Sequence, residues 1–349
     1  MSNAVCFAYA PEKLPADSRL PDRVELFEIL KSNDLRPFVT LGGESAFTND
    51  HINPSRLDGD VDPITSQLNR NELGLIVNRL DRSIKHDSLS NPDVPPMINE
   101  NAVRKIGYHK ERAAREILSP LGLSMPTALI TSSDDIDRFV QEHDYDQYFL
   151  KPRHGSFSAG TYKMGKAALA KFYSDNPNMF DKHIVQPAYD FSRPFPRSIK
   201  SLTRSTNEEF DRLNVAGNTK ELRMYSFVSP GKVDLYPAAR VLQPDAASRK
   251  TVSAWFFVDP ESIPQTLIEQ ATDVTTYIAS ITGSYAMYGA VDFGYGTADS
   301  QLPDWKIIEL NILAPGMISR SENRFVATKL KTLLSNQIRA TIDQVAKIQ

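Results

Sequence analysis

Two polar residues near the C-terminal end of the chain stand where a buried strand is expected. Glu309 and Asn311 lie two positions apart in the apolar segment WKIIELNI. Successive side chains of a strand point to opposite faces, so Glu309 and Asn311 share one face. The other face takes Ile308, Leu310 and Ile312. A carboxylate and an amide therefore lie side by side and can offer two oxygen ligands to a metal ion.

A third oxygen ligand is available from an earlier segment. Asp292 lies in GAVDFGYG, which also reads as a strand. Buried charges are rarely left without a partner, and Mg²⁺ prefers carboxylate and carbonyl oxygens. Each residue taken alone could equally occupy an edge or a solvent-facing position. Together, Asp292, Glu309 and Asn311 predict a magnesium site.

A lysine followed by a loop of small residues suggests phosphate binding. Lys151 lies near the end of the strand-like segment QYFLKP, and the loop after it contains Gly155, Ser156, Ser158 and Gly160. Backbone N–H groups of such a loop can fold over phosphate oxygens, with Lys151 as a point charge beside them. The loop lacks the residue order of a P-loop, and an ordinary surface turn is an equal alternative.

The composition is that of an ordinary globular protein. The chain has 349 residues, of which 41% are hydrophobic and 24% charged, and its net charge is −3. This charge indicates no general nucleic-acid or membrane surface. The single cysteine, Cys6, excludes an internal disulfide. No apolar stretch approaches the roughly 18 residues of a membrane span, and the N-terminus has no secretory pattern, so we expect a cytoplasmic protein.

The apolar pattern predicts alternating strands and helices. In the first part, AVCFAYA and RPFVTL read as strands around a helix, residues 64–82 read as a second helix, and a proline-rich stretch marks a boundary near residue 98. In the second part, one helix is expected to run to Gly122, QYFLKP and HIVQPAYD read as strands, and ELRMYSFV pairs with VDLYPAARVL across a Ser-Pro-Gly turn. We expect an α/β protein (α+β subdomains) with domains 1–98 and 99–349, the second divided after residue 188.

With these features the sequence resembles the ATP-grasp ligases over about residues 99–320. Their recurring plan is a lysine on a helix, a second lysine before a small-residue loop, a hinge strand at the adenine, and an Asp…Glu-x-Asn magnesium set. The resemblance implies an ATP-grasp fold preceded by an N-terminal α/β (pre-ATP-grasp) domain. It also implies ATP and Mg²⁺ as cofactors, with the magnesium held by the three oxygen-bearing residues described above.

The resemblance assigns nucleotide contacts by position. Lys110 in GYHKERAA would be the first lysine, near the α- and β-phosphates, and Lys151 the second. Gln186 in HIVQPAYD would lie near the adenine amino group. The backbone at Pro187 and Ala188 would line the edge of the ring.

The paired strands in ELRMYSFVSPGKVDLYPAAR look like those of glutathione-synthetase-type ligases. In those enzymes an arginine on the first strand and another at the end of the second face the reacting phosphoryl group. The matching positions are Arg223 and Arg240, which the resemblance implies as catalytic residues. A surface salt bridge is the alternative for each.

The resemblance implies an ATP-dependent carboxylate–amine ligase that forms an amide or peptide bond and releases ADP. A substrate carboxylate would attack the γ-phosphorus to give an acyl phosphate, and an amine would then displace phosphate. The expected partners are small-molecule carboxylate and amine substrates, such as amino acids or small peptides, and a homodimer or a homotetramer is compatible with these features. Two alternatives stay open: a small-molecule kinase on the same fold, and a non-catalytic ATP-binding switch protein.

Residues 191–220, between the hinge and the first arginine strand, carry a run of cations. Arg193, Arg197, Lys200 and Arg204 fall within twelve residues that contain no acid. Prolines in this stretch discourage regular structure, and long loops in compact domains are often lids. We expect a mobile segment over the site that helps to select the substrate; a solvated linker is the alternative.

Overall fold

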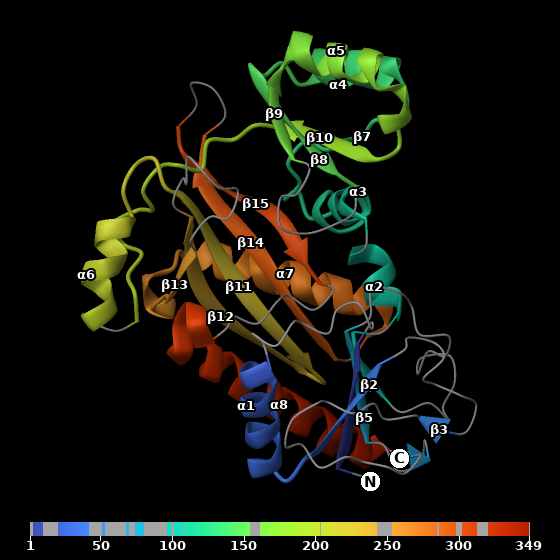
Figure 1. Ribbon diagram of the computed structural model, residues 1–349, viewed down its shortest axis with the longest axis vertical. Helices are drawn as coiled ribbons and strands as arrows, with labels where there is room; N and C mark the ends of the chain where they lie inside the picture. Colours follow the sequence, from blue (N-terminus) through green and yellow to red (C-terminus); the bar gives the residue numbers. More distant parts are fainter. Residues whose placement is uncertain are drawn as a thin grey trace.

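The structure, a computed structural model, contains three main sheets that follow one another along the long axis of the molecule (Figure 1). It describes residues 3–9, 20–41, 51–52, 68–69, 74–79, 96–99, 101–107, 109–153, 161–202, 204–242, 253–284, 286–297, 302–312 and 320–348. Within these residues no helix is long and apolar enough to cross a membrane.

The N-terminal sheet is parallel and has the strand order β2-β1-β5-β6. Its elements are β1 (Ala4–Tyr9), α1 (Leu20–Ser32), β2 (Arg36–Leu41), β5 (Leu75–Arg79) and β6 (Met97–Ile98), and a separate short pair is β3 (His51–Ile52) with β4 (Leu68–Asn69). The expected strand–helix–strand beginning is confirmed. The helix expected over residues 64–82 was wrong, because β5 runs through it. Leu75, Ile76 and Val77 are all buried, as in a parallel strand covered on both faces, and a short apolar run does not distinguish that strand from a helix.

The segment expected as one helix up to Gly122 is broken at His109. It forms α2 (Asn101–Gly107), then α3 (Lys110–Arg112), which continues directly into the π-helical turn η5 (Ala113–Leu118). His109 is extended, with φ −114° and ψ 118°. Lys110 thereby begins a new helix, and its N–H donates a hydrogen bond to the carbonyl of Arg153 at 3.4 Å. The apolar periodicity continues across the break, so the sequence pattern did not reveal it.

The second sheet is antiparallel, with the order β7-β10-β8-β9. Its region contains β7 (Ala128–Leu129), α4 (Ser133–Glu142), β8 (Gln147–Pro152), β9 (Tyr162–Gly165), α5 (Lys166–Asp175), η6 (Pro177–Met179) and β10 (His183–Pro187). Helix α4 begins with a capping box, in which Ser132 and Asp135 each bind the other's backbone N–H. Tyr148, Leu150 and Val185 lie in one buried cluster with residues of α4 and α5. The alternate residues of β8 and β10 consequently point away from these helices.

The third sheet is antiparallel and five-stranded, with the order β13-β12-β11-β14-β15. Its region contains α6 (Arg204–Leu213), β11 (Thr219–Ser229), β12 (Lys232–Leu242), β13 (Ser253–Phe257), η7 (Pro260–Ser262), α7 (Gln265–Thr282), β14 (Met287–Gly296), β15 (Asp304–Asn311) and α8 (Arg320–Ile348). The expected hairpin of β11 and β12 is confirmed. Its turn passes through Gly231 at φ +74°, a left-handed conformation that favours glycine.

Two buried cores lie on the two faces of this large sheet. One core joins the sheet to α7 through residues such as Leu222, Val291 and Leu267. The other joins the opposite face to α8, α1 and the N-terminal sheet (Figure 1). A buried ion pair, Lys331 Nζ to Glu25 Oε2 at 2.6 Å, links α8 to α1 within this second core. The large sheet is therefore covered on one face along its length and on the other only in part.

Residues 191–220 pack against the large sheet, so the expectation of a mobile segment over the site was wrong for its described residues. Their apolar side chains fill the α7 core; these are Phe195, Ile199, Phe210 and Leu213. The chain also bonds to the edge strand, since the N–H of Leu202 donates to Phe257 O at 2.7 Å. Figure 1 shows α6 beside β13, on the side of the molecule away from α3. Arg193, Arg197 and Lys200 are exposed, and the Arg204 side chain lies outside the described part.

A buried lysine holds this segment together. Lys220 is fully buried, and its Nζ donates to backbone carbonyls on both ends of the segment. The acceptors are Val215 O and Asn218 O at 2.6 Å each, Arg193 O at 3.2 Å and Ser192 O at 3.3 Å. A single ammonium thus satisfies several backbone groups that would otherwise be buried without a partner.

We expect Lys220→Met to lower the free energy of unfolding by about 3 kcal/mol, because it leaves these buried carbonyls without their donor. Urea unfolding of the variant and of the wild type measures the difference. Lys200→Met, at an exposed position of the same segment, is the matched control and should change the stability by less than about 0.5 kcal/mol. Equal effects of the two substitutions would contradict the bracing role of Lys220.

Candidate active site

One face of the large sheet is apolar at one end and charged at the other. Along β11, Phe227 and Tyr225 lie in the α8 core, and the next two residues on the same face are Arg223 and Glu221. The same change occurs along this face of β14, where Tyr288 lies in the α8 core and Asp292 lies further along, at the charged end. The charged side chains therefore begin where the apolar covering of this face ends.

Asp292 is the centre of the charged end. It lies opposite Arg223 in the register of β11 and β14, and the guanidinium binds both carboxylate oxygens at 2.6 Å. Asn311 Nδ2 also donates to Asp292 Oδ2 at 2.6 Å. The Asp292 side chain is 4% exposed and that of Arg223 13%. Such a pair requires close geometry, because removing either partner would leave a buried charge.

Glu309 lies on the same face because it is directly opposite Asp292, and a bulge in β15 lies next to this pair. The register runs from Asp292 opposite Glu309 to Phe293 opposite Ile307, which leaves Ile308 as the extra residue. Ile308 then lies near Gly294, on the face that carries Asp292. The expectation that Ile308 shares the buried face with Leu310 was wrong, since Ile307 takes that place in the core.

The oxygen-bearing residues fit the magnesium site expected of them. A carboxylate has about four lone-pair sites, and Arg223 and Asn311 occupy only part of those of Asp292. Glu309 is half-exposed, and its described partner is Lys110 Nζ at 3.6 Å. Within the described ranges, no three His, Cys, Asp or Glu side chains come close enough to hold a metal, so the amide oxygen of Asn311 would have to complete the set.

Arg240 and Glu221 extend the charged end towards the edge of the sheet. They face each other across β11 and β12, with Arg240 Nη1 3.4 Å from Glu221 Oε2. Burial raises the pKa of Glu221, and the carboxylates of Asp292 and Glu309 raise it further, against the lowering by the two arginines. Glu221 was not expected from the sequence, although it lies two residues before Arg223 on the same strand face.

The two lysines come from a different part of the fold. Lys110 begins α3, and Lys151 lies on β8, on the face that points away from α4 and α5. Burial lowers the pKa of Lys151 to about 8, Glu309 and Glu221 oppose this lowering, and Lys110 adds to it. Both lysines are therefore in electrostatic reach of Glu309.

Gln186 lies on β10, beside Lys151 on the same face of the small sheet. Its Nε2 donates to Thr127 Oγ1 at 2.8 Å, whereas its Oε1 is buried and has no hydrogen-bond partner among the described residues. An unpaired buried acceptor at this position is suited to a ligand amino group. Pro187 ends β10, and the N–H of Ala188 donates to Gln147 O at 2.9 Å.

Two glycines of β14 allow the chain that follows β10 to pack closely against this strand. A Cβ on Gly296 would lie 2.1 Å from the carbonyl oxygen of Asp190, and a Cβ on Gly294 would lie 2.5 Å from the Phe191 ring. Asp190 also pairs with Thr297 as an isolated bridge. The small sheet is thus joined to the end of β14 through one backbone contact, at Gly296, and one ring contact, at Gly294, both of which a side chain on β14 would obstruct.

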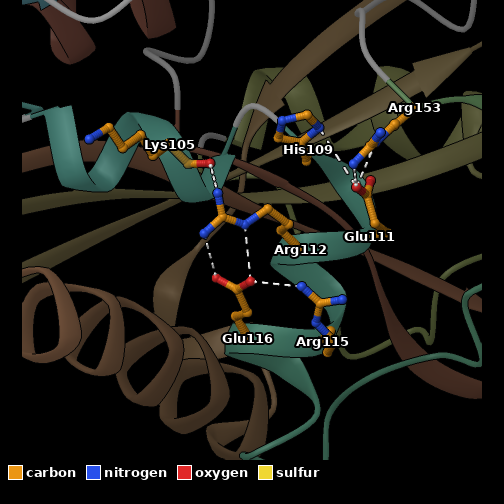
Figure 2. Close-up of polar contacts among 7 residues, drawn as sticks. All are labelled: Lys105, His109, Glu111, Arg112, Arg115, Glu116 and Arg153. Carbon is orange, nitrogen blue, oxygen red and sulfur yellow. Dashed lines mark hydrogen bonds and ion pairs between the residues drawn. The ribbon is translucent and has the colours of Figure 1, made fainter. Parts of the chain in front are cut away.

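An ion pair joins the two lysine-bearing elements (Figure 2). Arg153 Nε binds Glu111 Oε1 at 2.6 Å, and Arg153 Nη2 binds the same oxygen at 2.5 Å. Glu111 follows Lys110 on α3, and Arg153 lies two residues after Lys151. Glu111 is 7% exposed, and its Oε2 has no hydrogen-bond partner in the described part of the chain. The pair therefore fixes the start of α3 to the end of β8.

A second charged group lies on α3 and on the turn η5 that continues it, and it points away from the Glu111–Arg153 pair. Arg112 binds both carboxylate oxygens of Glu116 at 3.0 Å, and Arg115 binds Glu116 at 2.9 Å. Figure 2 shows this group pointing away from Arg153. Its side chains are more exposed than Glu111.

Part of the expected site lies outside the described residues. This applies to the small-residue loop, that is, to Gly155, Ser156, Ser158 and Gly160. Sequence reasoning missed Glu111 and Arg153, since nothing in their local sequence shows that they meet.

Comparison with known proteins identifies the fold. No protein-family model matches the sequence, and no curated protein matches it. Solved structures do match over nearly the whole chain. D-alanyl-alanine synthetase A from Vibrio cholerae O1 biovar eltor is 12% identical, covers 98% of this chain and 99% of its own, and has a TM-score of 0.61. VanG D-Ala:D-Ser ligase from Enterococcus faecalis is 12% identical, with 98% and 100% covered and a TM-score of 0.60.

A third matching structure is that of the ATP-grasp ligase PsnB with a phosphomimetic variant of its minimal precursor, Mg and ADP. It is 15% identical, with 97% of this chain and 98% of that chain covered and a TM-score of 0.53. The chain therefore has the ATP-grasp fold. The expected fold class, α/β with this fold, is confirmed.

We expect Glu111→Gln to lower the free energy of unfolding by about 3 kcal/mol, because it leaves the Arg153 charge partly buried without its partner. Glu116→Gln, on the same short helix, should cost less than about 1 kcal/mol, since its pairs are more exposed. Urea unfolding measures both. The double variant Glu111→Met with Arg153→Met should recover most of the loss; a double variant as unstable as Glu111→Gln would contradict the argument.

Proposed function

From the ATP-grasp fold of this chain, we propose that the protein is an ATP-dependent carboxylate–amine ligase that releases ADP and acts on amino acids or small peptides. One observation carries the proposal: four cations, from helix α3, the small sheet and the large sheet itself, converge on the carboxylates at the charged end of the large sheet. They are Lys110, Lys151, Arg223 and Arg240. Such a cluster suits a polyphosphate whose terminal group is transferred.

The matching structures support the same class of reaction. Two of them are named as a D-alanyl-alanine synthetase and a D-Ala:D-Ser ligase, and both names describe the joining of amino acids. The third contains Mg and ADP. These are properties of those proteins, and they motivate the test on this one.

In the proposed reaction, a substrate carboxylate oxygen attacks the γ-phosphorus of ATP, and ADP leaves with the electrons of the broken P–O bond. An amine then attacks the acyl carbon, phosphate leaves, and the amine loses a proton as the amide forms. The protein supplies position and charge rather than a nucleophile. Arg223 and Arg240 stabilise the negative charge that moves between the oxygens, and the two lysines hold the phosphates.

Asp292, Glu309 and Asn311 would hold magnesium, which when bound supplies positive charge beside the phosphates. Gln186 Oε1, buried and without a described partner, would accept a hydrogen bond from the adenine amino group.

The first test identifies the products of turnover. We would incubate the protein with a panel of amino acids, ATP and Mg²⁺. We expect ADP, phosphate and an amide whose mass is that of the two joined amino acids minus one water, detected by mass spectrometry. Glu309→Gln should abolish turnover, because it removes a charge from the metal set. Glu269→Gln, on the exposed side of α7, is the matched control and should retain it.

Other products would contradict the ligase. AMP and pyrophosphate would exclude the acyl-phosphate route. ADP with a phosphorylated alcohol would indicate a kinase, and tight ATP binding without turnover on any tested substrate pair would favour a switch protein.

The pH dependence of nucleotide binding should report on Lys151. Burial lowers the pKa of this lysine to about 8, and bound phosphates would raise it, so binding above pH 8 takes up a proton. We expect the affinity for a non-hydrolysable ATP analogue to fall as the pH rises above about 8, by up to about tenfold per unit. Isothermal titration calorimetry in buffers of different ionisation enthalpy measures the affinity and the proton uptake.

Lys151→Arg is the control for this titration, because its guanidinium stays charged throughout. The variant should bind with an affinity that no longer changes in this pH range. If the affinity of Lys151→Arg still falls as the pH rises, the titration belongs to another group. Lys220 is one such group, since burial also lowers its pKa to about 8.

A further inference from the structure

We propose that Trp255 is a positioning residue that holds Arg223 and Arg240 in place for the transferred phosphoryl group. The inference rests on the proposed function for the role of the two arginines, and on geometry for their link to Trp255. The indole of Trp255 is in contact with both cations. The Arg223 Cζ lies 5.4 Å from the centroid of the ring, and the Arg240 Cζ lies 5.5 Å from it.

The sheet register explains how one ring reaches two strands. Trp255 on β13 lies directly opposite Arg240 on β12. Arg223 is one strand further away, on β11, and its neighbour on β12 is Ala238. Because Ala238 has only a methyl group, the indole can extend across β12 towards Arg223. A large side chain at this position would occupy that space.

The two arginines differ in how much they depend on the ring. Arg223 is also held by both oxygens of Asp292 and by the Tyr225 ring at 5.8 Å. Arg240 has one contact with Glu221 at 3.4 Å, and its Nε has no hydrogen-bond partner in the described part of the chain. The face of an indole attracts a cation, and the attraction grows when water is excluded. Trp255 is 5% exposed, so water is largely excluded from its contact with Arg240.

This arrangement also leaves donors of Arg240 for a new anion. A cation–π contact fixes a guanidinium without using its N–H donors, unlike a salt bridge. Among the described residues, the donors of Arg240 other than the one facing Glu221 therefore have no competing acceptor. Trp255 would keep them in place before the nucleotide arrives, which preorganises the site.

The test compares two nucleotides that differ at the terminal phosphate. We would measure the dissociation constants of ADP and of the non-hydrolysable ATP analogue AMP-PNP with Mg²⁺ by calorimetry, and use their ratio as the readout. Trp255→Leu should weaken AMP-PNP relative to ADP by about tenfold, which corresponds to about 1.4 kcal/mol. Trp255→Phe keeps an aromatic face and should stay within about threefold of the wild type.

A matched control separates this role from loss of packing. Phe257 lies two residues further along β13, on the same face and in the same core, and its described ring contact is with Phe325. Phe257→Leu should leave the ratio of the two dissociation constants unchanged. The proposal would be overturned if Phe257→Leu changed this ratio as much as Trp255→Leu does. It would also be overturned if Trp255→Phe changed the ratio as much as Trp255→Leu.

A spectroscopic measurement tests the contact without any nucleotide. The chain has two tryptophans, so Trp305→Phe leaves Trp255 as the only one. In that background, Arg240→Met should change the emission of Trp255, whereas Lys232→Met, at an exposed cation of the same strand, should not. An unchanged emission in the Arg240 variant would overturn the contact. If the wild type binds neither nucleotide, the proposed function fails, and the emission comparison still decides whether Trp255 holds Arg240.

Discussion

The buried ion pair of Arg223 and Asp292 is the interaction on which the charged end of the molecule depends. Two charges removed from water are stable only if each is matched closely, and here both oxygens of Asp292 meet the guanidinium at 2.6 Å. That requirement fixes the register of β11 against β14. It also fixes the neighbours on either side, because Glu309 is placed by the pairing of β14 with β15, and Arg240 by that of β11 with β12.

The same sheet face serves as a core at one end and as a site at the other. The apolar end is anchored by α8, which is itself tied to α1 by the Glu25–Lys331 pair. This anchoring makes the charged end a rigid platform, and side chains on rigid strands hold their geometry better than side chains on loops. Lys151 and Gln186 lie on the small sheet, and Lys110 lies on α3. The small sheet is joined to the platform at Gly296, which the Asp190 backbone approaches too closely for any side chain, and at Gly294, against which the Phe191 ring packs.

Local patterns in the sequence were sufficient for most of the strands and for the shared face of the oxygen-bearing residues. The alternation in WKIIELNI placed Glu309 and Asn311 on one face, and the structure confirms that they lie near Asp292. The capping box of α4 and the hairpin turn at Gly231 were also legible, since both depend on contacts within a few residues. Where the sequence failed, the deciding contact was distant. The run of residues 75–79 is a strand because it pairs with β1 and β6, and its apolar pattern alone fits a helix equally well.

What the sequence by itself determined is the chemical character of the site: the types of ligand, the two lysines and the two arginines, each marked by its position in a strand or beside a loop. Only the tertiary structure decided how they are held. The meeting of Glu111 with Arg153 and the reach of Trp255 over Ala238 join residues far apart in the chain. So does the burial of Lys220 among backbone carbonyls, which turned an expected lid into a packed segment. Such contacts depend on which surfaces the folded chain brings together, and local periodicity carries no information about that.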